Sequence, residues 1–568
     1  MTRILSKSAF IAALSLIILA GYAVLFGSSS GAAELHQAPH LAASNTTNFS
    51  APVGSLTRGQ ATDAGEVRIV VTTNQGGNLL SRVVATVPNP GVMTSEDTSS
   101  SAAAPNQTAA AGDIVFSQIY ASGGLVGSTF QNNFLQVFNR TNNTIDINSW
   151  RFHISDANGT SGLTISFASS RGIGIPAHRY LLIQFGDPSP NGSPVPNPDF
   201  IVPGTFPPPP PGFPPIPPFN LPTSGKVFLT GPAANLSATS CPLPNPEVID
   251  LVGYGSTNTC FEGTGPTATI NNTTAAVRKN GGLIDTDNNA NDFAVRPPTP
   301  LNHTSRPIDD AEFFVRQHYS DFLNRPPDAS GLSFWVDQIP ACVDAQPCLD
   351  VRRINVSAAF FLSIEFQETG YLVERLYKTS YGDATGTSTV GGAHQISVPI
   401  VRFNEFLPDT QQIGQGVIIG DPNAPMILEN NKVAFIDQFV QRTRFTTAFP
   451  VSMTSEQFVD TLNTNAGGAL SQAQRDQLVS DLSTSAKTRA QVLRAVAEDA
   501  DLVNAEKNRA FVLMQYLGYL RRNANDAPDS DYSGYDFWLT KLLQFNGNFV
   551  NAEMVKAFIS SSEYRQRF

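Results

Sequence analysis

The stretch Phe314-Val315-Arg316-Gln317-His318-Tyr319-Ser320-Asp321-Phe322-Leu323 returns in altered form from Phe511 to Leu520. In the first stretch Val315, Tyr319 and Phe322 lie at positions i, i+4 and i+7, which is the spacing of one apolar face of a helix. The second stretch keeps that face as Val512, Tyr516 and Tyr519. Since a helix buries its apolar face against other elements, the sequence predicts an all-α helical module that contains a divergent repeat.

The repeat continues beyond the first helix. A loop follows each helix, then a turn with aspartate, serine and glycine, then a helix that carries Phe-Trp; the loop is longer in the second copy, with twelve positions from Arg522 to Gly534 against six from Arg325 to Gly331. Asp and Ser side chains accept hydrogen bonds from free helix N–H groups, and Gly permits a tight turn. Further aligned pairs are Phe360 with Phe558, Ser363 with Ser561, Glu365 with Glu563, and Phe366 with Tyr564. The residues that define the repeat are Tyr319, Gly331, Trp335, Tyr516, Gly534 and Trp538.

Length and net charge indicate the broad class of protein. The chain has 568 residues, more than one hydrophobic core can serve, so several domains are expected. Lys and Arg number 36 against 47 Asp and Glu, for a net charge of −11. This balance argues against a broad nucleic-acid-binding surface.

The N-terminus has the features of a secretory signal: Arg3 and Lys7, an apolar run from Phe10 to Phe26, then Gly31-Ala32-Ala33. We expect cleavage after residue 33 and a protein that is secreted, extracellular or on the surface of a bacterial cell. The alternative is a membrane anchor through residues 10–26. Residues 34–112 are rich in Ser, Thr, Ala, Asn and Gly and predict a low-complexity stalk or linker, with one strand at Val67–Val71.

Four cysteines fit an oxidising compartment. Their neighbourhood in the sequence predicts two disulfides, Cys241 with Cys260 and Cys342 with Cys348. A zinc site made by all four is the alternative, but it lacks paired close spacings and would need two domains to converge.

From residue 113 to 304 short apolar runs alternate with Gly, Asn and Pro, which predicts an antiparallel β-sandwich. A Pro-rich loop at 187–223 includes Pro207 to Pro211; we expect a stiff exposed loop, with docking to an aromatic-lined groove as the alternative. The expected strands are Ile114–Tyr120, Phe134–Phe138, Tyr180–Phe185, Val227–Leu229 and Val248–Val252.

This segment resembles the lamin-tail domain of secreted bacterial proteins. The resemblance rests on Asp113 to Ser117, Phe134 to Asn139, Asn148-Ser149-Trp150, Ile175-Pro176-Ala177, Asp250 to Gly255, Arg278 and Asp285 to Phe293. It implies an immunoglobulin-like sandwich that binds or tethers. One departure is Gln136, where many members have Glu.

The part after Pro307 resembles the bacterial family called domain of unknown function 4214, which implies a helical fold and no established chemistry. The expected parts are a first copy at 305–381, an irregular connecting segment at 382–429 and a second part at 430–568.

Two acidic loops are candidate calcium sites, because Ca²⁺ needs six to eight closely spaced oxygen ligands. Asp285, Asp287 and Asn289 take positions one, three and five of the first, but Ala290 and Arg296 exclude an ordinary EF-hand. Asp529, Asp531 and Ser533 begin the second, which lacks the final bidentate carboxylate. Asx-turns and helix caps are the alternative for both loops.

No catalytic residue is predicted. The seven histidines are scattered, and His318 becomes Gln515 in the second copy, so we expect a helix-surface role for it. Trp335 and Trp538 could stack on sugars, but their equivalent positions beside Phe favour core packing.

The sequence therefore predicts a secreted or cell-surface interaction or tethering protein without enzymatic activity. The expected partner is a surface protein or polysaccharide, with no nucleic acid and no cofactor apart from calcium in the two loops. The alternatives are a calcium-supported adhesin or carbohydrate binder, and a secreted hydrolase or an accessory subunit of one.

Overall fold

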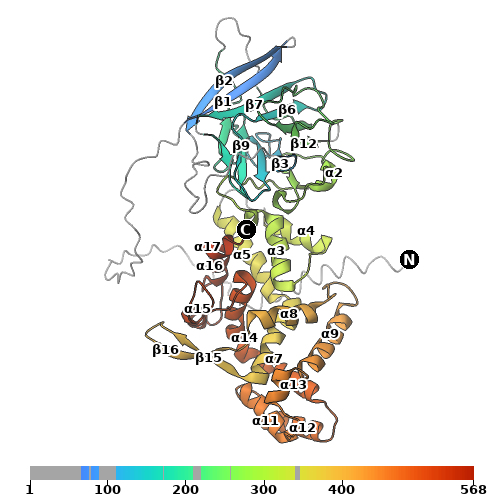
Figure 1. Ribbon diagram of the computed structural model, residues 1–568, viewed down its shortest axis with the longest axis vertical. Helices are drawn as coiled ribbons and strands as arrows, with labels where there is room; N and C mark the ends of the chain where they lie inside the picture. Colours follow the sequence, from blue (N-terminus) through green and yellow to red (C-terminus); the bar gives the residue numbers. More distant parts are fainter. Residues whose placement is uncertain are drawn as a thin grey trace, which may run out of the picture. The chain divides into compact units, whose positions relative to one another are not determined.

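The computed structural model describes residues 66–75, 78–88, 110–170, 172–208, 219–255, 258–339 and 346–568. A sheet region comes first in the chain and a helical region follows it (Figure 1), so the predicted order of a β-sandwich and then helices is confirmed. None of the helices within these residues has the length and apolar character needed to cross a membrane. The predicted signal at 1–33 and the anchor at 10–26 lie outside the described residues.

Two six-stranded sheets form the sandwich. The first has the order β12-β11-β6-β7-β1-β2, and the second has the order β10-β9-β4-β3-β13-β14. The strands of the first sheet are β12 (Val248–Tyr254), β11 (Gly225–Thr230), β6 (Arg151–Asp156), β7 (Gly162–Ser169), β1 (Glu66–Gln75) and β2 (Asn78–Pro88). Those of the second are β10 (Phe200–Val202), β9 (Tyr180–Phe185), β4 (Asn133–Asn139), β3 (Ile114–Tyr120), β13 (Ala275–Arg278) and β14 (Phe293–Arg296). A small third sheet pairs β5 (Ile145–Asp146) with β8 (Gly174–Ile175).

The core of the sandwich lies between the two sheets. Phe116 on β3 meets Phe152 on β6 edge to face, with ring centroids 6.4 Å apart. Phe167 on β7 stacks on Phe200 on β10 at 4.3 Å. Because apolar side chains from both sheets bury one another here, this layer supplies most of the apolar burial in the sandwich.

The five strands expected from the sequence are all present. Alternating residues in a strand usually indicate that one face is exposed. In β3, however, every residue is buried. Phe116 faces the main core, while Val115 packs with Phe138 and Tyr180 on the opposite face of its sheet.

The sandwich also takes two strands from the segment 34–112, where the sequence predicted a linker and a single strand at 67–71. β1 pairs with β7 from Val67 opposite Ser169 to Thr72 opposite Thr164, and β2 pairs with β1. The hairpin register places Gln75 opposite Asn78, and the two residues between them are glycines. A Gly-Gly pair is a strong signal for a two-residue hairpin, and it marks the strand that the prediction omitted.

One pair of strands departs from the predicted antiparallel arrangement. β10 lies inside the predicted loop 187–223 and runs parallel to β9, with Phe200 opposite Ile183. A parallel neighbour needs a crossover of a dozen or more residues, and residues 186–199 provide it. Pro207 and Pro208, at the start of the proline run, are exposed; residues 209–218 lie outside the described part of the chain.

The helical region has helices in both stretches of the chain that carry the motif. In the first copy they are α3 (Ala311–Leu323), α4 (Ala329–Gln338), α5 (Gln346–Leu362), α6 (Ile364–Phe366) and α7 (Leu372–Tyr381). In the second they are α14 (Ala500–Met514), α15 (Ser533–Gln544), α16 (Met554–Ser560) and α17 (Ser562–Arg565). Between them come α8 (Phe403–Gly414), α9 (Ala424–Phe439), α10 (Thr443–Ala448), α11 (Ser455–Asn465), α12 (Gln472–Ser483) and α13 (Arg489–Ala497). The short elements are α2 (Asn289–Asp292), the 3₁₀ turns η2 (Asn280–Gly282) and η3 (Pro307–Asp309), and the π-helical turns η4 (Gln367–Tyr371) and η5 (Gln515–Leu520).

The segment 382–429 is regular, in contrast to the irregular connection expected. It forms the hairpin of β15 (Asp383–Ser388) and β16 (His394–Pro399), followed by α8 and the first part of α9. Gly391 and Gly392 both adopt positive φ in the turn, a conformation that glycine reaches without a Cβ clash. The Gly- and Thr-rich composition that suggested irregularity is that of a hairpin.

The two copies pack against each other in one core. Phe322 on α3 and Tyr519 on η5, which occupy the same position of the motif, meet edge to face with ring centroids 5.1 Å apart. A Cβ on Gly518 would lie 2.1 Å from the Phe322 ring, so only glycine fits beneath it.

Candidate functional site

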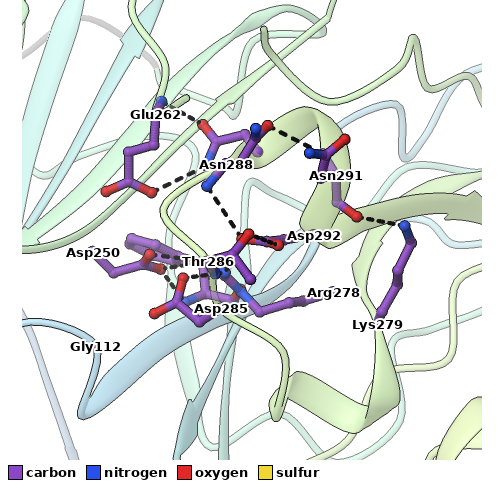
Figure 2. A network of polar contacts seen from close by, with 12 residues as sticks. Gly112, Asp250, Glu262, Arg278, Lys279, Asp285, Thr286, Asn288, Asn291 and Asp292 are labelled. Atoms are coloured by element: carbon purple, nitrogen blue, oxygen red, sulfur yellow. Dashed lines mark hydrogen bonds and ion pairs between the residues drawn. The ribbon is translucent and has the colours of Figure 1, made fainter. Parts of the chain in front are cut away.

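The most polar part of the sandwich interior surrounds Arg278 on β13, whose side chain is fully buried (Figure 2). Its guanidinium donates to the two oxygens of Asp250 at 2.8 and 3.0 Å and to Asp285 Oδ1 at 2.8 Å. Its Nε donates to the Phe116 carbonyl at 2.8 Å, and its Nη1 lies 3.6 Å from Asp292 Oδ2. Arg278 is therefore bound on several sides by groups of the sandwich itself.

Asp250 reaches this cluster from the middle of β12, between apolar neighbours. Besides Arg278, it accepts the backbone N–H of Phe116 at 2.6 Å, so it links β12 to β3. A carboxylate and a guanidinium inside apolar strands must pair, because either one buried alone would be strongly destabilising. The cluster thus ties strands of the two sheets together.

Glu262 adds a further carboxylate. One ligand atom each from Asp250, Glu262 and Asp285 lie within 4.8 Å of one another. Burial raises the pKa of Glu262 to about 8, and the negative charge of Asp250 adds to this effect. Burial likewise raises the pKa of Asp250 to about 6, although Arg278 acts in the opposite direction. Three carboxylates at this spacing are a donor set suited to a hard divalent cation, and here a guanidinium supplies positive charge.

The first predicted calcium loop contributes only Asp285 to this triad. Its Oδ2 accepts from Arg140 at 3.0 Å, in addition to the bond with Arg278. Asp287 is exposed and has a φ of 52°. The amide of Asn289 is buried and bonds backbone groups of β12, from Leu251 to Gly253, at 2.9 Å. The three loop residues therefore have different partners, and calcium binding by them stays a prediction.

Sequence reasoning did not single out Arg278, Asp250 and Glu262 as a site. A signal was present, since Asp250 and Arg278 are charged residues within or at the end of apolar strands, where an unpaired charge is rare. Which carboxylates would surround the arginine depends on strand pairing, which spacing alone does not reveal.

The second predicted calcium loop is also held by neighbours. Asp529 binds Arg522 at 2.7 Å, and Asp531 accepts the N–H of Ser533 at 2.9 Å as an Asx-turn. The Ser533 hydroxyl lies 2.9 Å from the hydroxyl of Thr389, next to the β15–β16 hairpin. Calcium binding here likewise stays a prediction.

The repeat residues form the same close contact in both copies. A Cβ on Gly331 would lie 2.4 Å from the Tyr319 hydroxyl, and a Cβ on Gly534 would lie 2.5 Å from the Tyr516 hydroxyl. Neither glycine has a positive φ. Glycine occupies these turns because the tyrosine comes close, and not because the backbone requires an unusual conformation.

An arginine and a glutamate complete each copy. Arg325 binds Glu365 through two hydrogen bonds of 2.8 Å, and Arg522 binds Glu563 through bonds of 2.5 and 3.0 Å. The arginines also lie over the motif tyrosines, 5.0 Å from the ring centroid in the first copy and 5.4 Å in the second. Each arginine therefore pairs with a glutamate that lies 40 residues further along the chain in the first copy and 41 in the second.

The tryptophans of the repeat pack inward and the phenylalanines before them point outward. Trp335 lies 5.8 Å from Phe360, and Trp538 lies 5.6 Å from Phe558. Phe334 is 43 % exposed and Phe537 is 48 % exposed. Both copies thus present an aromatic ring to solvent at the same position of the motif.

His318 is buried, which corrects the expected helix-surface role. Its Nδ1 lies 2.7 Å from the Phe314 carbonyl and its Nε2 lies 2.7 Å from Ser357 Oγ, which in turn bonds the hydroxyl of Tyr519. Burial lowers the pKa of His318 to about 3, so the ring is neutral, with a proton on Nδ1. Gln515 in the second copy makes a similar bond to the Phe511 carbonyl, at 3.0 Å.

Cys241 and Cys260 form a disulfide, with Cα atoms 5.5 Å apart, in agreement with the prediction. Cys342 lies outside the described residues, so the pair predicted with Cys348 stays a prediction.

No protein-family model matches the chain, and neither a curated protein nor a solved structure matches it. The resemblances to the lamin-tail domain and to domain of unknown function 4214 therefore rest on the quoted residues and on the order of elements.

Proposed function

We propose that the chain is a secreted or cell-surface protein that binds or tethers a partner without catalysing a reaction, through a sandwich of the lamin-tail type and a helical module of the domain-of-unknown-function-4214 type. The observation that carries the proposal is the exposed aromatic ring at the same motif position in both copies, Phe334 and Phe537. Each ring packs edge to face on the tryptophan that follows it, with centroids 4.9 and 5.1 Å apart, and the rest of the ring is open to contact with a partner.

The matched contacts support the idea that the helical module arose from two diverged copies of one unit. The close Tyr–Gly approach, the Arg–Glu pair and the Trp–Phe contact each occur twice at aligned positions. The immunoglobulin-like character of the sandwich is supported by two sheets that share one core. The disulfide between Cys241 and Cys260 agrees with an oxidising compartment.

The test is localisation of the native protein, followed by cross-linking and identification of its neighbours. We expect an extracellular or surface location and neighbours that disappear in the variant Phe334→Ser/Phe537→Ser. Leu543→Ser is the matched control, because Leu543 lies on the same helix as Phe537 and is 54 % exposed. The Leu543→Ser variant should cross-link to the same neighbours as the wild type. A cytoplasmic location, or unchanged neighbours in a double variant that folds normally, would contradict the proposal.

A calcium-supported adhesin is the second candidate, and the triad of Asp250, Glu262 and Asp285 favours it. Calorimetric titration with calcium, together with melting in the presence and absence of a chelator, tests this version. Heat of binding and a chelator-sensitive melting temperature would support it, and if neither appears, Asp250 and Asp285 serve only as ion-pair partners of Arg278.

A further inference from the structure

The helical region buries the carboxyl group of Glu374, which forms no ion pair among the described residues. Glu374 on α7 is 1 % exposed, and its Oε2 has no hydrogen-bond partner within the described part of the chain. Buried carboxylates are ordinarily paired with a cation or bound by several donors, because an isolated buried charge is strongly disfavoured.

The charged groups around Glu374 are committed to other partners. Glu506 on α14 is 5 % exposed, and its Oε2 lies 3.1 Å from Arg509 Nε. Lys378 on α7 lies 2.8 Å from Asp383 and 3.8 Å from Glu506, and Arg509 also binds Asp383, at 2.7 Å. Lys378 and Arg509 therefore form their ion pairs with Asp383 and Glu506, and Glu374 has no ion pair with either of them.

The remaining titratable neighbours do not change this balance. Arg375, next to Glu374 on α7, turns its Nε to the Ala497 carbonyl at 2.8 Å. Tyr371 on η4 and Tyr535 on α15 are buried phenols, and burial raises the pKa of each well above its usual value, so both are neutral. Glu374 thus faces buried neutral groups, the like charge of Glu506, and Arg375, whose charge favours the ionised carboxylate although it forms no ion pair with Glu374 in the described chain.

We propose that Glu374 is a proton-binding site that keeps its proton at neutral pH, and that its ionisation in alkaline solution loosens the packing of α7 against α14. Burial, together with the like charge of Glu506, raises the pKa of Glu374 to about 8, while Arg375, Arg509 and Lys378 lower it by less. In the unfolded chain a glutamate titrates near pH ~4.3. The folded state therefore holds one more proton between these values, and stability is lost as the pH rises from about 4.3 to about 8.

The variant Glu374→Gln tests the proposal, because glutamine resembles the protonated acid and does not titrate. The unfolding constant of the wild type, relative to that of the variant, should rise about tenfold per pH unit between about pH 5 and about pH 8 and then stay constant. Glu553→Gln is the control, since Glu553 is 64 % exposed. The unfolding constant of the wild type, relative to that of this variant, should not change with pH over this window. A ratio for Glu374→Gln that does not change with pH would overturn the proposal.

Hydrogen exchange in the wild-type chain gives a second measurement, which holds even where the variant fails to fold. After correction for the chemical exchange rate, protection of α7 and α14 amides should fall as the pH rises from about 5 to about 8 and then level off, because opening exposes Glu374 and lets it ionise. Amides of α12 that exchange by local opening should show no such change, since α12 carries no part of the cluster. Unchanged protection of α7 and α14 would overturn the proposal.

Discussion

The two copies of the helical motif keep the same inner contacts and differ in their loops. In the first copy Asp328 caps α4 by accepting the Gly331 N–H at 2.8 Å. In the second, the aligned Asp531 accepts the N–H of Ser533, the first residue of α15, at 2.9 Å, and Asp529 binds Arg522 at 2.7 Å. The acidic turn residues therefore make different contacts in the two copies, whereas the tyrosine, arginine and glutamate make the same contacts.

The copies also differ in how deeply their glutamates are buried. The Glu365 side chain is 4 % exposed in the first copy, and that of Glu563 is 33 % exposed in the second. One ion pair is thus nearly enclosed while its counterpart is partly hydrated. Because of this difference, we expect the two ion pairs to contribute unequally to the free energy of unfolding.

Removal of the arginines should give the largest effect and reveal this inequality. Arg325→Met leaves Glu365 buried without its cation and should lower the free energy of unfolding by about 3 kcal/mol. Arg522→Met leaves Glu563 able to reach water and should lower it by about 1 kcal/mol. Urea denaturation followed by tryptophan fluorescence measures both, since Trp335 and Trp538 report on their own copies.

Addition of Glu365→Gln to Arg325→Met provides the control for this interpretation. It removes the unpaired charge and should restore part of the lost stability. Equal losses for the two arginine variants, or no recovery with Glu365→Gln, would show that burial of the glutamate does not set the difference.

Alanine at the motif glycines should give the next largest effect. Gly331→Ala and Gly534→Ala each place a methyl group against a tyrosine hydroxyl and should each lower the free energy of unfolding by about 2 kcal/mol. A tyrosine-to-phenylalanine change in the same copy removes the clash. Rescue should be better in the second copy, because the next atom lies 3.7 Å from the new Cβ there, against 2.9 Å from Asp328 in the first.

A double-mutant cycle for each copy measures this rescue. The cycle should give a favourable coupling energy for Tyr516 with Gly534 and a smaller one for Tyr319 with Gly331. Equal coupling in the two copies would contradict the role assigned to Asp328.

The repeated helices could be predicted because their buried face follows helical spacing, from Val315 through Tyr319 to Phe322. The five expected strands could be predicted for a different reason, because apolar runs such as Tyr180–Phe185 are bounded by turn residues. The reason for the glycines could not, because the approach of Tyr319 to Gly331 depends on how α3 and α4 pack. Likewise, the buried position of His318 depends on Ser357 and Tyr519, which reach it from other parts of the chain.

The candidate site shows the same limit. The sequence singled out Asp285 for its spacing to Asp287 and Asn289, yet the structure brings it to Asp250 and Glu262. Spacing along the chain can predict only a site whose residues all lie in one loop. Only the pairing of β13 with β3, and the packing of β12 against β3 across the two sheets, makes a cluster from residues so far apart in the chain.

The exchange of His318 for Gln515 can be tested by pH. A histidine with a pKa near 3 in the fold and about 6.5 unfolded binds fewer protons when folded, so its stability contribution is lost as the pH falls below about 6.5. His318→Gln copies the second motif and removes this loss. Between about pH 7 and about pH 5 the stability of the wild type relative to the variant should fall by roughly 2 kcal/mol. A difference that is constant with pH would mean that His318 is not neutral and buried.

The serine caps should give the smallest effect and the closest agreement between copies. Ser363 accepts the Phe366 N–H at 3.1 Å, and Ser561 accepts the Tyr564 N–H at the same distance. Alanine at either position should lower the free energy of unfolding by about 1 kcal/mol. Because both bonds have the same length and both caps precede a short helix, we expect losses equal within the error of urea denaturation. A clear difference would mean that the loops, and not the cap bonds, determine the stability of the two helix ends.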